Sequence, residues 1–438
     1  MVGSTFSAEI IVRSIRLVLE GAISLRAASR ACSIVDRCDG GHGLDAPCQT
    51  TIQNHILRLG LYLIQRVDQR RDDWIWLMDH MINAGSTKCL VVLGISLEDY
   101  RKLKEPMSHQ DLDVIAVMPV ETSNGEVVCG QLEKLADQFG TPVATLSDRG
   151  SDLKKGVELF QKEHPDVASL YDIVHLISRV IKSIFESNSK WESYRQACCK
   201  SANFLRQSSL AHLKPPRPKT KARYMNYDRE VRWASRAIVV LDRVRSGRLN
   251  DRQKARLPLE LIEKRLGWLD KYRVLASVWL EVIWTGKAIC SLVRRNGYTK
   301  NTPDEIRSLL SKAKYDETCS LIDRVVTEVE PLCKSLAPGE SMPGSTEVLE
   351  SLIGKGKRLL HHSSNSVTRQ ILSLAATTTE ITTTLVQKAL STCRMKHMAQ
   401  WARENLTPGV HVARREDLSV TPEEQNLRKL LEPASPKF

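Results

Sequence analysis

The chain has 438 residues, enough for two or three domains with sizeable hydrophobic cores. Its composition, 42% hydrophobic and 26% charged, is ordinary for a soluble globular protein. No apolar run approaches the roughly 18 residues that a membrane span needs, so no membrane-spanning helix is expected. An excess of 64 Lys and Arg over 51 Asp and Glu gives a net charge of +13, which favours a polyanionic partner, nucleic acid before membrane. A basic protein without such a partner is the alternative.

Residues 1–70 predict a basic helical domain. Apolar residues recur at helical spacing over 8–20 and 24–35, and after a Gly- and Asp-rich loop a third helix over 50–59 is closed by Gly60. This order suits a helix-turn-helix, whose last helix enters the DNA major groove and offers Gln, Asn and Arg to bases or phosphates. The expected DNA contacts are Thr51, Gln53, Asn54 and Arg58. A plain three-helix packing unit is the alternative.

Residues 71–187 alternate between strand and helix patterns. The first three strands are close enough in sequence to pair as hairpins, so we predict a mixed five-stranded sheet in an α/β domain. Strands are expected at 74–82, 88–96, 112–120, 142–146 and 169–171. Helices are expected at 126–139, 151–162 and from 173 onward.

Residues 188–335 predict an all-helical segment. Within it, 213–233 is a basic, proline-containing stretch with interleaved Tyr224, Tyr227 and Trp233, which is typical of nucleic-acid binding or of a solvated loop. Further helices are predicted for 344–357, 367–394 and 395–406, and 407–438 is expected to be a charged tail. Tryptophans 268, 279 and 284 stand at helical spacing, which favours core packing over stacking on a DNA base.

Cysteine usage indicates reduced thiols in the cytosol, because the eleven cysteines are scattered without a CxxC pair and no secretory signal pattern opens the chain. One set is conceivable as a zinc site, but its irregular spacing matches no ligand pattern. That set is Cys32, Cys38, His42 and Cys48.

Three acids are placed where they can converge. Asp79 lies near the end of the first strand, Asp148 follows the fourth, and Glu350 lies on the helix that Ser345 is expected to cap. Such carboxylates can hold a pair of divalent ions, preferably Mg²⁺, for phosphoryl transfer. The alternative to Asp79 is Asp73, the alternative to Asp148 is Asp152, and the alternatives to Glu350 are Glu347 and Glu380. Arg149 is either a phosphate contact or simply exposed.

The stretches WIWLMDHM, TLSDRGSDL, YDIVH and STEVLESLIGKGK resemble the DDE transposases of bacterial insertion sequences. The resemblance implies a ribonuclease-H-like core in 71–187 and 336–406, with Asp79, Asp148 and Glu350 as the catalytic, metal-binding triad for two Mg²⁺ ions, or Mn²⁺ as a substitute. About two hundred residues separate the last two acids, so 188–335 resembles the helical insertion of hAT-like enzymes. The resemblance also implies that the chain binds double-stranded DNA, both the element ends and the target, and that it forms a homodimer or a higher oligomer on this DNA. The expected location is the bacterial cytoplasm, at the nucleoid.

The same resemblance extends to two further residues. Asp172-Ile-Val-His175 is similar to a Cys/Asp-x-x-His motif of these groups, which implies that His175 contacts the scissile phosphate or positions the nucleophile; a structural histidine is the alternative. Glu350 and Lys357 match half of a Tyr-x2-Arg-x3-Glu-x6-Lys signature, but the Tyr and Arg are missing. Lys357 is therefore either a DNA contact or a surface lysine.

The function implied is a DNA transposase that binds element ends, cleaves phosphodiester bonds and joins the freed 3′-hydroxyl ends to target DNA. Two alternatives remain. One is a transposase-derived, inactive DNA-binding regulator, and the other is a metal-dependent nuclease that does not transfer strands.

Overall fold

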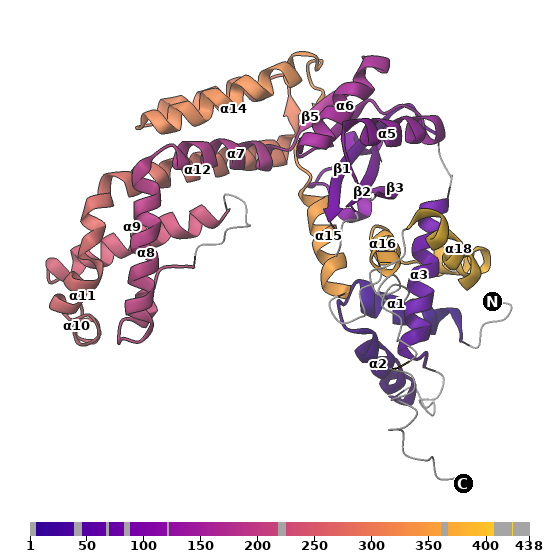
Figure 1. The fold of residues 1–438 in the computed structure, drawn as a ribbon, viewed down its shortest axis with the longest axis horizontal. Coiled ribbons are helices and arrows are strands. Elements are labelled where there is room, and N and C mark those ends of the chain that lie inside the picture. The colour runs from indigo at the N-terminus through magenta and orange to yellow at the C-terminus, as the bar shows by residue number, and fades with distance from the viewer. Residues whose placement is uncertain are drawn as a thin grey trace, which may run out of the picture.

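The computed structural model describes residues 6–38, 46–66, 70–82, 88–120, 122–217, 225–360 and 367–406, together with Glu423. Of residues 82, 225–226, 355–360 and 367, only the backbone is described. The described residues form an arch, with the sheet near its top and two helical arms descending from it (Figure 1).

Five strands form one mixed sheet in the order β3-β2-β1-β4-β5. Strands β2 and β3 continue antiparallel from β1, whereas β4 and β5 run parallel to it. Their bounds are β1 (Trp74–Ile82), β2 (Lys88–Ser96), β3 (Asp113–Val120), β4 (Ala144–Ser147) and β5 (Ala168–Tyr171). The prediction of a mixed five-stranded sheet in an α/β domain is confirmed, and the arrangement is compatible with a ribonuclease-H-like core.

The two faces of the sheet have different cores. Along β1, Trp74, Trp76 and Met78 face helices α5 (Gly125–Phe139) and α6 (Ser151–Glu163). The alternate residues of β1 belong to the larger core on the other face. That core also includes residues of helices α3 (Gln49–Gln65), α7 (Ile173–Glu186), α15 (Glu347–Leu360) and α16 (Val367–Ala376). Since side chains alternate along a strand, Asp79 belongs to this second face, as Leu77 and Met81 do.

The arm on the left of Figure 1 is built mainly of helices between β5 and α15. These are α7 (Ile173–Glu186), α8 (Ser189–Arg206), α9 (Met225–Arg245), α10 (Asp251–Arg256), α11 (Leu259–Leu266), α12 (Arg273–Asn296), α13 (Thr302–Arg307) and α14 (Asp316–Lys334). The segment departs from the all-helical prediction at β6 (Tyr298–Thr299), which pairs with β7 (Ser341–Met342). Helix α4 (Leu97–Lys102) follows β2, and α15 (Glu347–Leu360) follows β7.

Aromatic side chains fill the centre of this arm. Trp279 of α12 is buried and packs at 4.8 Å, centroid to centroid, against Trp191 of α8. Trp268 is partly buried, whereas Trp284 is 53% exposed. The prediction of core packing therefore holds for Trp279 and Trp268 but not for Trp284. One described stretch, Leu259–Asn296, meets the length and apolarity criteria for crossing a membrane, but this is weak evidence because a core helix meets them as well.

The other arm combines the two ends of the chain. Helices α1 (Ala8–Leu19), α2 (Leu25–Cys38) and α3 (Gln49–Gln65) pack with α16 (Val367–Ala376), α17 (Thr383–Thr392) and α18 (Met395–Asn405). Helices of the predicted N-terminal domain and of 336–406 therefore pack together, since α16, α17 and α18 contact α3.

Two helix boundaries differ from the prediction. Gly60 does not close α3, which continues to Gln65. The glycine instead lets α16 cross α3 closely, since a Cβ on Gly60 would lie 1.8 Å from the carbonyl oxygen of Leu372. The predicted helix over 367–394 divides in two. The buried hydroxyls of Thr377 and Thr378 donate to carbonyls of the last turn of α16 and end it there.

We predict that Gly60→Ala lowers the free energy of unfolding by roughly 3 kcal/mol, because two helix backbones would have to separate. Urea unfolding followed by circular dichroism measures this. Gly130→Ala in α5 is the matched control, since nothing lies within 4 Å of its added Cβ and the change is expected to stabilise by about 0.5–1 kcal/mol. Equal effects of the two substitutions would contradict the close crossing.

We predict an acid-sensitive contribution from His55 in α3. Burial, and secondarily the Arg58 charge, lower the pKa of His55 to about 4. The unfolded chain then binds a proton near pH 6.5 that the folded chain does not bind, so stability falls as the pH drops from about 6.5 to 4, by up to about 3 kcal/mol. His55→Leu should flatten the pH dependence of the unfolding free energy over this range. Parallel curves for the two proteins would refute the assignment.

Candidate active site

Two of the predicted acids lie at one edge of the sheet. The last pair between the parallel strands β1 and β4 is Met78 with Ser147, so Asp79 and Asp148 each come directly after this pair. Asp148 follows the end of β4, whereas β1 continues past Asp79 to Ile82 and pairs there with β2 alone. Asp148 lies in a tight turn, since its Oδ1 accepts a hydrogen bond of 2.8 Å from the backbone N–H of Gly150. Parallel register therefore explains why these two acids, far apart in sequence, lie side by side.

The third acid reaches the same edge through a histidine. His175 lies in the first turn of α7, and its Nε2 is 2.8 Å from Oε1 of Glu350 in α15. Its Nδ1 is 3.9 Å from Oδ2 of Asp148. The imidazole thus lies between two carboxylates that are about two hundred residues apart in sequence. All three side chains are partly buried, with exposed fractions of 19–27%.

Asp172 holds the two helices of this cluster together. It is fully buried and caps α7, accepting a 2.7 Å hydrogen bond from the backbone N–H of His175 on Oδ1. Its Oδ2 accepts from both the backbone N–H and the hydroxyl of Thr346. The carbonyl of Thr346 in turn accepts from the N–H of Glu350 at 3.1 Å, which opens α15. One buried carboxylate therefore fixes the helix of His175 against the helix of Glu350.

Sequence reasoning did not identify the role of Thr346. It considered the residue only as the place where a signature arginine is missing. The usable signal was local: a threonine at the start of an amphipathic helix is a common capping residue, and an Asp directly before an apolar helix is another. That the two caps bond to each other depends on packing, which spacing in the sequence does not reveal.

Asp152, the alternative to Asp148, lies in a separate polar cluster. Its carboxylate in α6 accepts from Ser123 Oγ at 2.7 Å and from Lys88 Nζ at 3.1 Å, and it lies 3.4 Å from Nδ1 of His80. Burial works to raise the pKa of Asp152, but the Ser123 hydrogen bond and the charges of His80 and Lys88 outweigh it and lower the pKa. Asp152 is thus held by its own partners, on the side of the sheet covered by α5 and α6.

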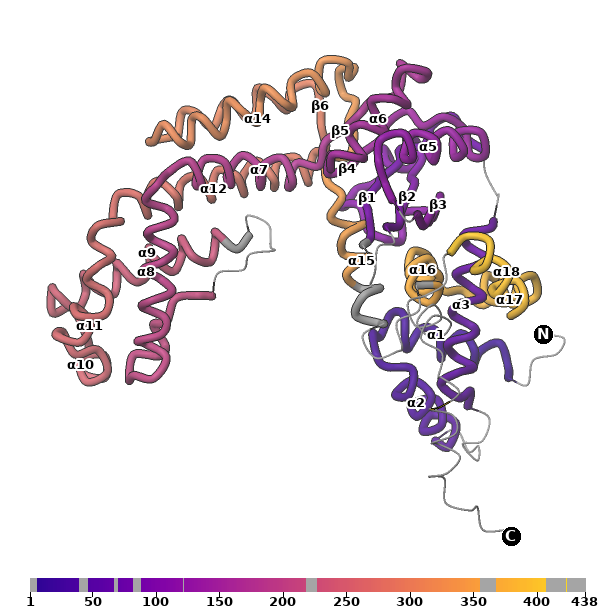
Figure 2. The backbone as a smooth tube through the Cα atoms, viewed as in Figure 1, coloured from indigo at the N-terminus to yellow at the C-terminus, as the bar shows by residue number. Residues whose placement is uncertain are grey.

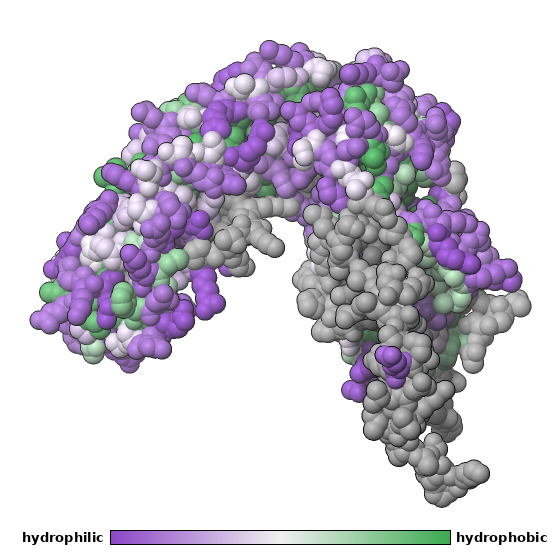
Figure 3. Space-filling model, in the orientation of Figure 1, coloured by the Kyte–Doolittle hydropathy of each residue, from purple (hydrophilic) through white to green (hydrophobic). Residues whose placement is uncertain are grey.

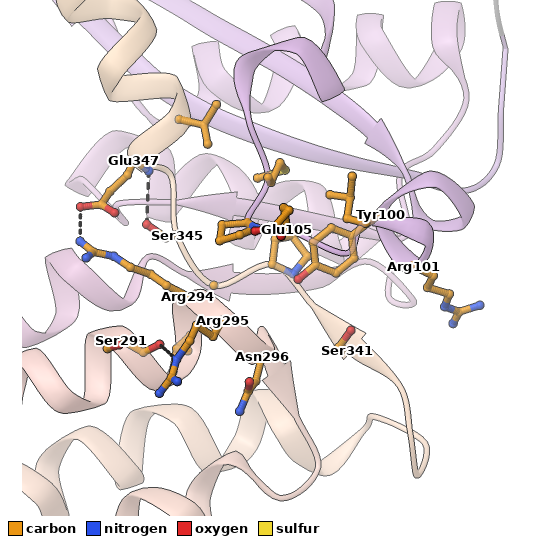
Figure 4. A pocket seen from close by; sticks show the side chains of 17 residues that line it. Tyr100, Arg101, Glu105, Ser291, Arg294, Arg295, Asn296, Ser341, Ser345 and Glu347 are labelled. Carbon is orange, nitrogen blue, oxygen red and sulfur yellow. Dashed lines mark hydrogen bonds and ion pairs between the residues drawn. The ribbon is translucent and has the colours of Figure 1, made fainter.

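The other alternative acids also lie apart from the cluster. Glu347 faces Arg294 of α12 and forms an ion pair with it beside a cavity of about 390 Å³ (Figure 4). Glu380 is exposed in the turn after α16, not in a helix as predicted. Asp73, at the start of β1, accepts a 2.9 Å hydrogen bond from Arg71.

Among the predicted DNA contacts, none of the four in α3 is fully exposed. Thr51, Gln53, Asn54 and Arg58 are all partly buried, and the Arg58 guanidinium donates to the carbonyls of Leu390 and Cys393 at the end of α17. Helix α3 is therefore a packing helix along most of its length.

The last two predicted DNA contacts lie elsewhere. Arg149 donates to the carbonyl of Ser169 at 2.9 Å and stacks over the Tyr171 ring, 5.0 Å from its centroid. The side chain of Lys357 lies outside the described residues.

The candidate site offers oxygen donors for a metal ion. Three carboxylates are the hard oxygen ligands that Mg²⁺ prefers, so the residues fit the ion in kind. As the described side chains are arranged, however, no three His, Cys, Asp or Glu residues are close enough together to hold a metal ion. His175 lies between two of the carboxylates. Of the residues considered as a zinc site, Cys32 is buried, Cys38 and Cys48 are exposed, and His42 lies outside the described residues.

Comparison with known proteins identifies no family. No family model matches the chain, and no curated protein matches it. Among solved structures, the chain is similar to the Drosophila P element transposase strand transfer complex, with 12% sequence identity and a TM-score of 0.30. The match covers 92% of this chain and 81% of that chain. A TM-score of this size carries no argument about fold or activity.

We predict that Asp172→Asn lowers the free energy of unfolding by about 3 kcal/mol, because an amide turns one accepting oxygen into a donor that faces buried N–H or O–H groups. Denaturant unfolding measures the change. Asn124→Ala, which removes the exposed cap of α5, is the control and should cost only about 1 kcal/mol. Similar losses for both variants would show that Asp172 is an ordinary helix cap.

Proposed function

We propose that the chain is a DNA transposase whose active site is formed by Asp79, Asp148, Glu350 and His175. The observation that carries the proposal is the approach of Glu350 and Asp148 to one imidazole, at the end of β4, where Asp79 directly follows the last residue of β1 that pairs with β4. Acids from two strand ends and a packed helix are what a two-metal phosphoryl-transfer site requires. A net charge of +13 supports a polyanionic partner.

Each residue has a distinct role in this proposal. The three carboxylates would hold two Mg²⁺ ions, or Mn²⁺, and these ions would supply activation of the attacking oxygen and stabilisation of the leaving one. His175 donates a hydrogen bond to the scissile phosphate, from a position fixed by Asp172. The protein contributes mainly position and charge, because phosphoryl transfer leaves it little covalent work. Two element ends must be held together, so the active form is a dimer or a larger assembly on double-stranded DNA.

One observation favours a second candidate, an inactive DNA-binding regulator derived from a transposase. Among the described residues, no three His, Cys, Asp or Glu side chains are close enough together to hold a metal ion, and an imidazole lies between two of the acids. A regulator would bind DNA without needing metal. A third possibility, a nuclease without strand transfer, uses the same acids and differs only in its products.

We predict that Asp79→Asn, Asp148→Asn and Glu350→Gln, each made separately, reduce DNA cleavage and joining by at least about 100-fold in Mg²⁺. The substrate is duplex DNA carrying the sequences that flank the gene. Glu347→Gln is the matched control, because it lies on the same helix, three residues before Glu350, and its carboxylate pairs with Arg294. It should keep most of the activity.

The products separate the candidates. Joined products from the wild-type protein support a transposase, and nicked products alone support a nuclease. DNA binding without cleavage in either Mg²⁺ or Mn²⁺ supports the regulator. Full activity of any one acid variant removes that residue from the active site.

A further inference from the structure

Helix α2 carries a stripe of exposed arginines on the surface of the arm formed by α1 to α3 and α16 to α18. Its buried side is formed by the small residues Ala28 and Cys32, which pack toward α1 and α3. Its opposite side exposes Arg26, Arg30 and Arg37. At about 100° per residue, these three arginines lie within roughly 40° of one another around the helix. They extend along it for about 16 Å, since each residue rises about 1.5 Å.

The arginines of the stripe differ from several arginines of the other arm in their partners. On the other arm, Arg245 pairs with Glu263 and Asp270, and Arg273 pairs with Asp242. In the part of the chain that the structure describes, none of the three α2 arginines forms an ion pair with a carboxylate. Positive charge concentrated on one helix face without compensation is a surface suited to a polyanion.

The hydrogen bonds of the stripe leave its charged ends available. Arg26 donates through Nε to Oε1 of Gln49 at 2.8 Å, and Arg37 donates through Nε to the carbonyl of Ser33 at 3.2 Å. Both bonds use the inner nitrogen, so among the described residues the terminal nitrogens of these guanidinium groups have no partner. The contact with Gln49 also places the stripe beside the N-terminus of α3, where the helix dipole favours anions.

We propose that this face of α2 is the surface that binds duplex DNA. The proposal rests on the proposed function and moves DNA contact from the packed helix α3 to the exposed helix α2. A helix fits the major groove, about 12 Å wide, and a stripe of three arginines can meet the phosphates along its edge or the guanine edges within it. Helix α2 lies toward the outer end of its arm, well away from the sheet (Figure 2), so DNA held there extends along the molecule.

The described surface of the molecule is largely hydrophilic. A space-filling view shows hydrophilic residues over much of the arm formed by α8 to α12 and over the region of the sheet (Figure 3). The exposed Ile34, 55% accessible, borders the stripe and offers an apolar contact of the kind that a thymine methyl group accepts.

The test compares three proteins at full length in a fluorescence-anisotropy titration of a labelled mixed-sequence DNA duplex. The first is the wild type and the second carries Arg26→Gln, Arg30→Gln and Arg37→Gln. The third is a control with the same loss of charge at three exposed arginines of the other arm, Arg248→Gln, Arg252→Gln and Arg256→Gln. Each titration is repeated over a range of salt concentrations, without divalent metal.

We expect the α2 variant to bind at least about tenfold more weakly and to lose two to three of the ions released on binding, seen as a shallower slope of log Kd against log salt, by about 2–3. The control should lose less than half of that slope. Replacing the same three α2 arginines with lysine should restore the slope, because the charge returns. Thermal unfolding should be unchanged, since all the substituted side chains are exposed.

The outcomes separate this inference from the proposed function. Wild-type binding to duplex DNA with equal losses in the α2 variant and the control overturns the α2 surface and leaves the transposase proposal standing. No binding of duplex DNA by the wild type overturns both. A specific loss in the α2 variant that lysine reverses supports the α2 surface, whatever the protein does to DNA afterwards.

Discussion

The arrangement of the candidate site depends on one buried carboxylate. Asp172 has no access to solvent, and burying a charge is costly unless hydrogen bonds replace the lost water. Those bonds come from two helices at once, from His175 at the start of α7 and from Thr346 before α15. The buried carboxylate therefore keeps α7 and α15 in contact, because moving α15 away would leave one of its oxygens without donors. The buried hydroxyl of Tyr298, which donates to the carbonyl of Tyr171 at 2.6 Å, reinforces the same corner.

Much of the sheet was predictable from the sequence because its signals are local. Strands β1 and β2 are continuous apolar runs with breaks between them, and α5 is bounded by Asn124 and Gly140, its cap residues. The place of Asp148 followed from this, since a residue just after a strand lies at the edge of the sheet, whereas Asp79 lies inside β1, next to the last residue that pairs with β4. The helix of Glu350 was also predicted from its local pattern, but its approach to His175 depends on packing between distant segments, which local signals do not reveal.

What the sequence did not reveal were contacts between distant helices. The pattern of α3 offered polar residues to DNA, but whether a partly apolar helix is covered depends on what else packs on it. The glycine taken as the end of α3 is instead where a helix from the far end of the chain crosses it. The same packing engages Arg58, whose guanidinium satisfies carbonyls at the end of α17. Exposure of α2 became visible only once α3 had been placed.

The joining of α3 to α16, α17 and α18 has a consequence for how the protein can be divided. Cutting the chain ahead of residue 367 would uncover the apolar side of α3, including Ile56 and Leu59, which are buried in the intact molecule. Helices α1 to α3 are thus one half of a folding unit whose other half, α16 to α18, follows about three hundred residues later, so a ribosome must translate both halves before this arm can close.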